Sequence, residues 1–414
     1  MKKLVALLLA LTLCIGLCAC GATAEKPAEE TPATTGETET PATDAKDIKV
    51  GFIFLHDENS TYDLNFINAA KAAAAELGLS DDQIMMKTNI AESQACYDAA
   101  AELVDAGCDL VITDSFGHES FALAAAKEFP EVQFVSCTGV KAHTEGLSNF
   151  HNAFASIYEG RYLAGVAAGL KLNEMIENGD ITAEEAKMGY VGAYPYAEVK
   201  SGYTSFFLGA RSICPSVTME VTFTSSWYDE ALEKEAANKL INNGCVLISQ
   251  HADSMGAPTA CETAGVPNVS YNGSTVAACP NTFIVSSRID WTPFFVYAIN
   301  CVASGEDIGY DWTGTLATGS VVLTDVNEQA AAAGTVEKIA EVMKALEDGS
   351  VKVFDTATFT VNGETVTTYL ADVDDLGDYV GETEVVSDGV FLESYYRSAP
   401  YFDLDIDGIT NLDA

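Results

Sequence analysis

The chain carries one pattern of alternating strand-like and helix-like segments twice, and this repeat limits the fold more than any other feature of the sequence. Segments of the first copy return 135 to 138 positions later. Short apolar runs that alternate with helical stretches are typical of a parallel sheet covered by helices. Three pairs of similar segments that occur in the same order favour two similar lobes over an accidental likeness between α/β units. They pair Lys49-Val50-Gly51-Phe52 with Lys187-Met188-Gly189-Tyr190, residues 103–112 with 240–248, and residues 129–136 with 265–271.

The first copy shows the order of elements most clearly. Gly78 and Gly107 each follow a helical stretch, where a left-handed residue commonly ends a helix. The predicted fold is therefore α/β, with two similar three-layer lobes, parallel sheets and a ligand cleft between the lobes. Strands are predicted at 48–55, 84–88, 109–113 and 132–136, and helices at 65–77, 93–106 and up to 129.

The cleft is expected at the carboxyl ends of the strands, because the loops there diverge and expose polar groups. Eight aromatic residues fall in or beside these loops, and aromatic faces suit a flat ring. Five carboxylates join them as acceptors for ligand N–H or hydroxyl groups. The alternative for each aromatic residue is core packing. The aromatic residues are Tyr62, Phe66, Phe116, Tyr194, Tyr196, Tyr203, Trp227 and Tyr271; the acids are Asp57, Asp114, Glu159, Glu198 and Asp253.

Metal binding and catalysis receive less support from the sequence. His56, His118 and His251 fall at predicted strand ends and, with Asp57 and Asp253, offer zinc-type ligands, but none has the local spacing of a metal motif. Phosphate-loop, dinucleotide and nucleophile-elbow motifs do not occur. We expect no metal, no cofactor and no enzymatic activity; a cleft hydrolase that uses Asp253 and His251 is the alternative.

The charge excludes one class of function. The chain has 61 acidic and 21 basic residues, a formal net charge of -40. Nucleic-acid binding depends on dense Lys and Arg, so we expect no nucleic-acid partner.

The amino terminus resembles a bacterial lipoprotein signal. Met1-Lys2-Lys3 precedes an apolar run that ends in Leu17-Cys18-Ala19-Cys20, which is too short for a transmembrane helix. Cys20 is then the lipidated residue, and the protein is anchored to the extracytoplasmic face of the cell membrane. An ordinary signal peptide is the alternative. Of the eight later cysteines, Cys108, Cys137 and Cys245 lie in or beside apolar runs, which favours buried free thiols.

Five separated segments, in order, resemble the basic membrane lipoprotein family of ABC-transporter substrate-binding proteins, which includes receptors for purines and purine nucleosides. The resemblance implies a type I periplasmic-binding fold, a purine nucleoside or nucleobase ligand, and an ABC permease as partner. The alternative ligand is another small solute, such as a sugar or an amino acid. The segments are Asp114-Ser115-Phe116-Gly117, Tyr158-Glu159-Gly160-Arg161-Tyr162, Glu198-Val199, Ser226-Trp227-Tyr228-Asp229 and Gln250-His251-Ala252-Asp253-Ser254.

The resemblance also implies roles for individual residues. Phe116 and Trp227 are the stacking candidates, and Asp253 is the hydrogen-bonding candidate. The loop at 56–66 lacks the Ser-Phe-Asn found in many members, so nucleoside and free base remain alternatives. Glu159 has a structural alternative as the solvated start of an amphipathic helix. The full predicted ligand set is Asp57, Tyr62, Ser115, Phe116, Glu159, Glu198, Trp227, His251, Asp253 and Tyr271.

The expected organisation of the chain follows from these patterns. It comprises a lipoprotein signal peptide (1–19), a lipidated cysteine with a flexible stalk (20–46), a first lobe (47–152 with about 286–320), a second lobe (153–285 with about 321–360), and an acidic C-terminal extension that packs on the lobes (361–414).

Overall fold

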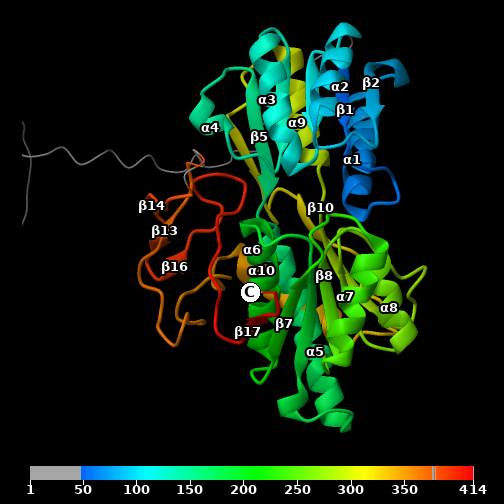
Figure 1. Ribbon diagram of the computed structural model, residues 1–414, viewed down its shortest axis with the longest axis vertical. Coiled ribbons are helices and arrows are strands. Elements are labelled where there is room, and N and C mark those ends of the chain that lie inside the picture. Colours follow the sequence, from blue (N-terminus) through cyan, green and yellow to red (C-terminus); the bar gives the residue numbers. More distant parts are fainter. Residues whose placement is uncertain (1–47, 375–376, 378, 414) are drawn as a thin grey trace, which may run out of the picture. The chain divides into compact units, whose positions relative to one another are not determined.

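A computed structural model describes residues 48–374, 377 and 379–413. The predicted signal peptide, the stalk and Cys20 lie outside the described residues. Two large sheets organise the described chain, and helices cover both faces of each sheet (Figure 1). Two small two-stranded ribbons and three short 3-10 helices complete it. The α/β fold class predicted from the sequence is confirmed.

The first sheet has six parallel strands in the order β11-β5-β4-β3-β1-β2. Helices α1 and α9 pack on one face around Phe66 and Phe294, and α2 and α3 pack on the other around Ala99 and Ala122. The strands are β1 (Val50–Ile53), β2 (Ile84–Lys87), β3 (Leu110–Thr113), β4 (Gln133–Cys137), β5 (Phe150–Ala155) and β11 (Asp311–Gly314); the helices are α1 (Thr61–Leu77), α2 (Gln94–Asp105), α3 (Glu119–Glu128), α4 (Ala142–Glu145) and α9 (Thr292–Ser304).

The second sheet repeats this plan with seven strands in the order β12-β10-β9-β8-β6-β7-β17, all parallel except β12. Helices α5, α6 and α10 contribute to the core on one face, and α7 and α8 cover the other. The strands are β6 (Lys187–Gly192), β7 (Thr218–Phe223), β8 (Leu247–His251), β9 (Asn268–Tyr271), β10 (Phe283–Ile289), β12 (Val321–Leu323) and β17 (Ile409–Asn411); the helices are α5 (Ile157–Asn178), α6 (Ala197–Ile213), α7 (Glu230–Asn242), α8 (Gly256–Ala264) and α10 (Thr335–Glu347).

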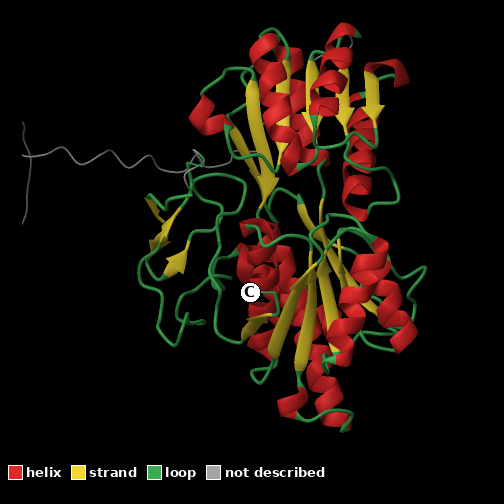
Figure 2. Cartoon of the chain, in the orientation of Figure 1, coloured by secondary structure: helices red, strands yellow, loops and turns green. Residues whose placement is uncertain are grey.

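The chain passes between the sheets three times, after β5, β10 and β11 (Figure 2). The first two passages follow Ala155 and Ile289, slightly later than the lobe boundaries expected from the sequence, because β5 and β10 continue to those residues. The third passage leads from β11 to β12.

Two helix starts differ from the sequence prediction and change where site residues lie. The Ser60 hydroxyl caps α1 by accepting a hydrogen bond from Asp63 N, so the helix begins at Thr61 rather than at residue 65. Helix α6 begins at Ala197 and places Glu198 in its first turn. Tyr62 and Glu198 therefore project from rigid helix starts and not from loops.

Helices α5 and α6 approach each other closely through glycine. A Cβ atom at Gly165 would lie 2.0 Å from Phe206 O, and one at Gly209 would lie 2.1 Å from Tyr162 O. No side chain fits at either position. This contact fixes α5 against α6 and so sets the position of Arg161 on α5 beneath the second sheet.

The C-terminal extension contacts both sheets. Strand β17 pairs with β7, and the Glu393 carboxylate accepts a hydrogen bond from the Ser201 hydroxyl on α6. Ser398 N donates to Asp311 Oδ2 on β11 at 2.6 Å. The extension therefore links the start of α6 to the far edge of the first sheet.

Two sequence features of the described chain concern its surroundings. Within the described residues, no helix combines the length and apolar character that a membrane crossing requires. The eight cysteines from Cys96 to Cys301 are all buried and free. The prediction of buried thiols at Cys108, Cys137 and Cys245 is confirmed.

Candidate functional site

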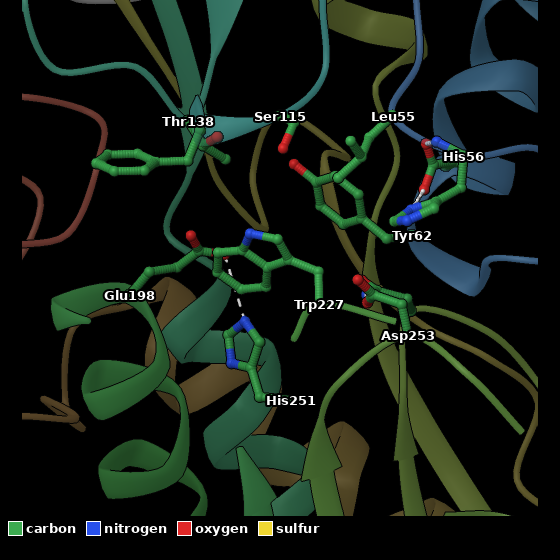
Figure 3. Close-up of a pocket in the computed structure, with 12 residues that line it drawn as sticks. Leu55, His56, Tyr62, Ser115, Thr138, Glu198, Trp227, His251 and Asp253 are labelled. Atoms are coloured by element: carbon green, nitrogen blue, oxygen red, sulfur yellow. Dashed lines mark hydrogen bonds and ion pairs between the residues drawn. The ribbon is translucent and has the colours of Figure 1, made fainter. Parts of the chain in front are cut away.

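A cavity of about 370 Å³ lies at the carboxyl ends of the strands, with residues from both sheets on its wall (Figure 3). In Figure 3 the Trp227 indole lies centrally, between Glu198 on one side and Asp253 on the other. The lining residues are Leu55, His56, Tyr62, Asp63, Ser115, Phe116, Thr138, Glu198, Trp227, His251, Asp253 and Asn272.

A pair of buried acids organises the first-sheet wall. Asp63 accepts hydrogen bonds from His56 N at 2.7 Å and from the Ser60 hydroxyl at 2.6 Å. Asp114, at the end of β3, accepts from Leu55 N at 3.0 Å. The Tyr62 hydroxyl donates to Asp114 O at 2.8 Å, which holds the phenol ring across the end of the strand. These bonds join the ends of β1 and β3 to the start of α1.

The two acids have opposite pKa shifts. Burial, the Asp63 charge and a hydrogen bond with Asp63 raise the pKa of Asp114 well above its usual value. Burial also acts to raise the pKa of Asp63, but hydrogen bonds from His56, Asp114 and Ser60 outweigh it and lower that pKa. Asp114 thus holds its proton more strongly than Asp63 does.

Phe116 extends from the same wall on a short anchored segment. The Glu92 carboxylate accepts hydrogen bonds from the Ser115 hydroxyl at 2.6 Å and from Gly117 N at 2.8 Å. The Phe116 side chain is 40% exposed, and its ring centroid lies 5.7 Å from that of Tyr196. Phe116 and Tyr196 therefore bring an aromatic ring from each half of the chain together at the rim.

An aromatic cluster forms the second-sheet wall. The Trp227 and Tyr194 rings meet edge to face at 5.1 Å, and Tyr194 stacks on Tyr196 at 5.0 Å. The Trp227 carbonyl accepts a hydrogen bond from Asp253 N at 3.0 Å, so the backbone fixes the loop that carries the indole. The indole thus contacts two aromatic side chains of its own half, Tyr194 and Tyr196.

Two carboxylates reach the cavity from this second half. Glu198 Oε1 lies 3.3 Å from His251 Nε2, and in Figure 3 the other oxygen of Glu198 points away from the histidine. Asp253 Oδ1 accepts a hydrogen bond from Asn272 Nδ2 at 3.0 Å. Burial, followed by the Asp63 and Glu233 charges, raises the pKa of Asp253 well above its usual value.

The electrostatics of the wall are one-sided. Among the described residues that line the cavity, three are acids and none is lysine or arginine. Burial lowers the pKa of His251 despite its contact with Glu198, so the ring carries no charge near neutral pH. An anionic ligand finds no cationic partner on this wall, whereas N–H and O–H donors find several acceptors.

Backbone strain is concentrated at the same place. Thr138 and Asn272 line the cavity with φ values of 67° and 66°, in the left-handed region that non-glycine residues seldom adopt. Such strain persists where surrounding bonds enforce it, and it is common at ligand sites. Thr138 N donates to Ala153 O and Asn272 N donates to Ser287 O, and these bonds hold the two turns.

Seven of the ten predicted ligand residues line the cavity, and Asp57, Glu159 and Tyr271 do not. Asp57 bonds to Asn59 and Asn89, and Glu159 Oε2 accepts from Leu316 N at 3.2 Å. Tyr271 is 1% exposed and lies behind His251. The seven are Tyr62, Ser115, Phe116, Glu198, Trp227, His251 and Asp253.

Leu55, His56, Asp63, Thr138 and Asn272 were missed as lining residues. His56, Thr138 and Asn272 lie in the loops that follow β1, β4 and β9. The choice of side chain within each loop depends on strand ends and backbone angles that the sequence does not specify. Asp63 precedes the predicted helix start at residue 65, so the sequence did not place it in the first turn of α1.

The histidines do not form a common metal site. His56 contacts Asp63, His118 contacts Asp114 and His251 contacts Glu198, each in a separate pair. Within the described chain, the acidic group with metal-ligand spacing is Asp372, Asp374 and Glu382 in the C-terminal extension, outside the cavity wall.

Comparison with known proteins identifies the family. The family model described as "ABC transporter substrate-binding protein PnrA-like", named Bmp, matches residues 53–353. The chain belongs to this family. It is therefore an ABC transporter substrate-binding protein, and the resemblance seen in the sequence is confirmed. Its family and fold are those of solute-binding proteins rather than of enzymes.

Individual relatives differ in the ligands that their names state. A purine-binding protein of Brucella abortus (strain 2308) is 31% identical over 261 residues, which cover 62% of this chain and 69% of the relative. A putative ABC transporter glucose-binding protein of Haloferax volcanii is 31% identical over 217 residues, and the match spans about half of each chain, 52%.

Solved structures show the same fold at low sequence identity. A solute-binding protein of an ABC transporter system from Aeropyrum pernix K1 has a TM-score of 0.61 and 18% identity, covering 74% of this chain and 92% of that one. A counterpart from Conexibacter woesei has a TM-score of 0.58 and 20% identity, covering 74% and 98%.

Proposed function

We propose that this Bmp-family protein binds a purine nucleoside or nucleobase in the cavity and delivers it to an ABC permease. Its Cys20 carries a lipid that anchors the mature chain to the extracytoplasmic face of the bacterial cell membrane. The predicted organisation, with a signal at 1–19, a stalk at 20–46 and an acidic extension at 361–414, belongs to this proposal. The purine-binding relative supports the ligand class.

The observation that carries the proposal is the placement of the Trp227 indole between two acids on a wall that has no cation among its described residues. A purine ring presents a flat apolar face together with edge N–H groups. Stacking on an indole adds about 0.5–1.5 kcal/mol to the free energy gained by burying the ring. Glu198 and Asp253 are then in place to meet the polar edge.

The wall assigns a role to each group. Trp227 and Phe116 stack on the ring, and Glu198 accepts a ring or exocyclic N–H group. Asp253, whose pKa is raised by burial, donates as a neutral acid or accepts through its free oxygen. Ser115 and Tyr62 lie on the first-sheet wall, where their hydroxyl groups are available to the ribose of a nucleoside. The proposal therefore includes both a nucleoside and a free base as ligand.

Calorimetric titration of the purified protein with adenine, guanine, adenosine, guanosine and inosine tests the ligand class. We expect stoichiometric binding of at least one of them, and no binding of the corresponding 5′-monophosphate because the wall offers no cation. Glucose, ribose and a mixture of amino acids are the competing ligands. Binding confined to those compounds would overturn the purine assignment.

Chromatography of the same samples after prolonged incubation tests the binding role. We expect the nucleoside to be recovered intact. Release of a free base would indicate hydrolysis at Asp253 and His251 and would contradict a pure binding function.

Mass spectrometry of the protein expressed in a bacterium tests the anchor. We expect a lipid on Cys20 and its loss, with release from the membrane fraction, in Cys20→Ser. An unmodified Cys20 in a cleaved protein would leave only an ordinary signal peptide.

A further inference from the structure

Arg161 is a completely buried cation behind the cavity wall. It lies on α5 with 0% exposure, and its guanidinium nitrogens contact five oxygen atoms of the second sheet. Nη2 donates to the Ser249 and Tyr190 hydroxyls at 2.9 and 3.0 Å and lies 3.4 Å from Gln250 O; Nη1 lies 3.3 Å from Ser270 O and 3.4 Å from the Ser287 hydroxyl.

No carboxylate of the described chain pairs with this guanidinium; all five oxygen partners are neutral. The rings of Tyr190, Phe206 and Tyr271 lie 5.4, 5.1 and 4.9 Å from the Arg161 Cζ atom. Hydrogen bonds and ring faces make the buried charge tolerable, but they do not cancel it. A positive potential therefore remains in the low-dielectric space beneath the wall.

A short series of side chains leads from Arg161 to the cavity. The Tyr271 ring lies between, with its centroid 4.5 Å from that of His251. His251 in turn contacts Glu198 at 3.3 Å, and Glu198 lines the cavity. The groups that contact His251 are thus Glu198 from α6 and Tyr271 from β9, with Arg161 from α5 behind the Tyr271 ring and Asp253 two residues further along the chain.

The geometry around His251 defines its proton. A carboxylate only accepts hydrogen bonds, so Nε2 carries the hydrogen that is shared with Glu198. Nδ1 is buried and has no hydrogen-bond partner among the described residues. It faces Gly202, where an added Cβ would lie only 2.8 Å from Nδ1. A second proton on Nδ1 would be buried without an acceptor among the described residues.

We propose that Arg161 is a positioning residue of the ligand site. Its guanidinium adds to the effect of burial in keeping the His251 ring uncharged, which leaves Glu198 free to accept a hydrogen bond from a ligand N–H group. An imidazolium at 251 would form an ion pair with Glu198 and weaken Glu198 as an acceptor. The effect on ligand affinity rests on the proposed function, whereas the effect on His251 does not.

NMR titration of the imidazole Cε1–H signals in ligand-free protein tests the inference. The loss of one signal in His251→Gln assigns the residue. In the wild-type protein we expect the pKa of His251 to lie below its ordinary value, because the ring is buried. Arg161→Met should raise the pKa of His251 by about one unit or more, and Arg161→Lys, which keeps the charge, should leave it within about half a unit of the wild type.

Arg211→Met is the matched control. Arg211 also lies over a ring in the second half, 4.8 Å from the Phe207 centroid, but its nitrogens bond to Asp407 O and Thr358 O instead of contacting the cavity floor. It should leave the His251 titration unchanged. Arg161→Gln, which is neutral but still a hydrogen-bond donor, replaces Arg161→Met if that variant does not fold.

Three results would overturn the inference: a wild-type His251 pKa at or above its ordinary value, an unchanged His251 in the neutral variants, or an equal shift in Arg161→Lys. Inosine and adenosine titrations between pH 5 and 8 provide the second readout. Affinity should fall toward low pH only in the neutral variants. Failure of both nucleosides to bind would contradict the proposed function, while the NMR result would still decide the role of Arg161.

Discussion

Strands β3 and β8 hold matching positions in the two sheets, because each pairs with the first strand of its half in the same register, Val50 with Leu110 and Met188 with Leu247. Their carboxyl ends nevertheless carry different chemistry. Asp114 follows β3, and His251 is its counterpart at the end of β8. Two residues further on, Phe116 corresponds to Asp253.

The buried groups behind the two ends differ in the same way. The first half holds a pair of buried acids, Asp63 and Asp114, whose pKa values are shifted in opposite directions. The second half holds the guanidinium of Arg161 without a carboxylate partner in the described chain. A duplicated fold therefore supplies two equivalent frames, and the two walls differ in the charged groups buried behind them.

The sharpest test of this division compares one aromatic residue from each wall. Trp227→Ala removes a supported, half-buried indole, and we expect purine affinity to fall by about 10- to 100-fold. Phe116→Ala removes a ring that is 40% exposed, and the loss should be only a few-fold. Calorimetry with the nucleoside that binds best measures both. Equal losses would show that the walls contribute alike.

The acid pair of the first half is tested by two amide substitutions. Asp63→Asn replaces the ionised acceptor of His56 N and Ser60, and it should lower the free energy of unfolding by about 2–3 kcal/mol. Asp114→Asn replaces a neutral acid with a neutral amide, and the change should stay within about 1 kcal/mol. Urea unfolding at pH 7 measures both. A larger effect for Asp114→Asn would contradict the assignment of the proton.

Glu233 provides a pH dependence that belongs to the second half. Burial, partly offset by hydrogen bonds from Ser254 and Asp229 N, raises its pKa to about 7. Since the folded protein binds this proton more tightly than the unfolded chain, the contribution of Glu233 to stability is greatest below about pH 4.5 and declines as the pH rises to 7. The decline cannot exceed about 1.4 kcal/mol per pH unit.

Glu233→Gln should remove that decline in the free energy of unfolding. The corresponding position of α2 in the first half is Cys96, which does not titrate in this range because burial raises its pKa to about 12. Glu262→Gln is the control, since hydrogen bonds lower the pKa of Glu262 and its contribution is lost at low pH instead. If the free energy of unfolding of Glu233→Gln declined with pH as it does in the wild type, the raised pKa of Glu233 would be contradicted.

The smallest effect is expected at an exposed cation of the second half. Arg288 lies 3.4 Å from Asp290, with both side chains about one-third exposed. Ion pairs of this kind contribute little, so Arg288→Ala should change the free energy of unfolding by less than about 0.5 kcal/mol. The free energy of unfolding of Arg161→Met, measured in the same assay, shows how the contribution of a buried arginine to stability differs from that of a partly exposed one.

The repeated pattern was sufficient to predict the two sheets, because strands such as β1 are apolar throughout and are bounded by turns. The five family segments also include Phe116, Trp227 and Asp253, which line the cavity. These predictions depend on local periodicity and on strand order, and both can be read from consecutive residues of the sequence.

The remaining site residues depend on contacts between distant segments. Glu159 was predicted from a matching segment, but it caps the Leu316 backbone at the start of a turn. Tyr271 ends β9 and is drawn inward by Arg161 and His251, which come from two other elements. Thr138 and Asn272 reach the cavity only because their backbones adopt positive φ. None of these arrangements has a signature in nearby sequence.

The buried cysteines can report local unfolding along the chain. Their thiols are distributed from α2 to α9, and burial raises the pKa of Cys108 and Cys279 to about 11 and of Cys245 to about 12. A thiol-reactive probe can modify each one only after its own segment opens. The rate at every cysteine then reports how often that segment unfolds, without any engineered label.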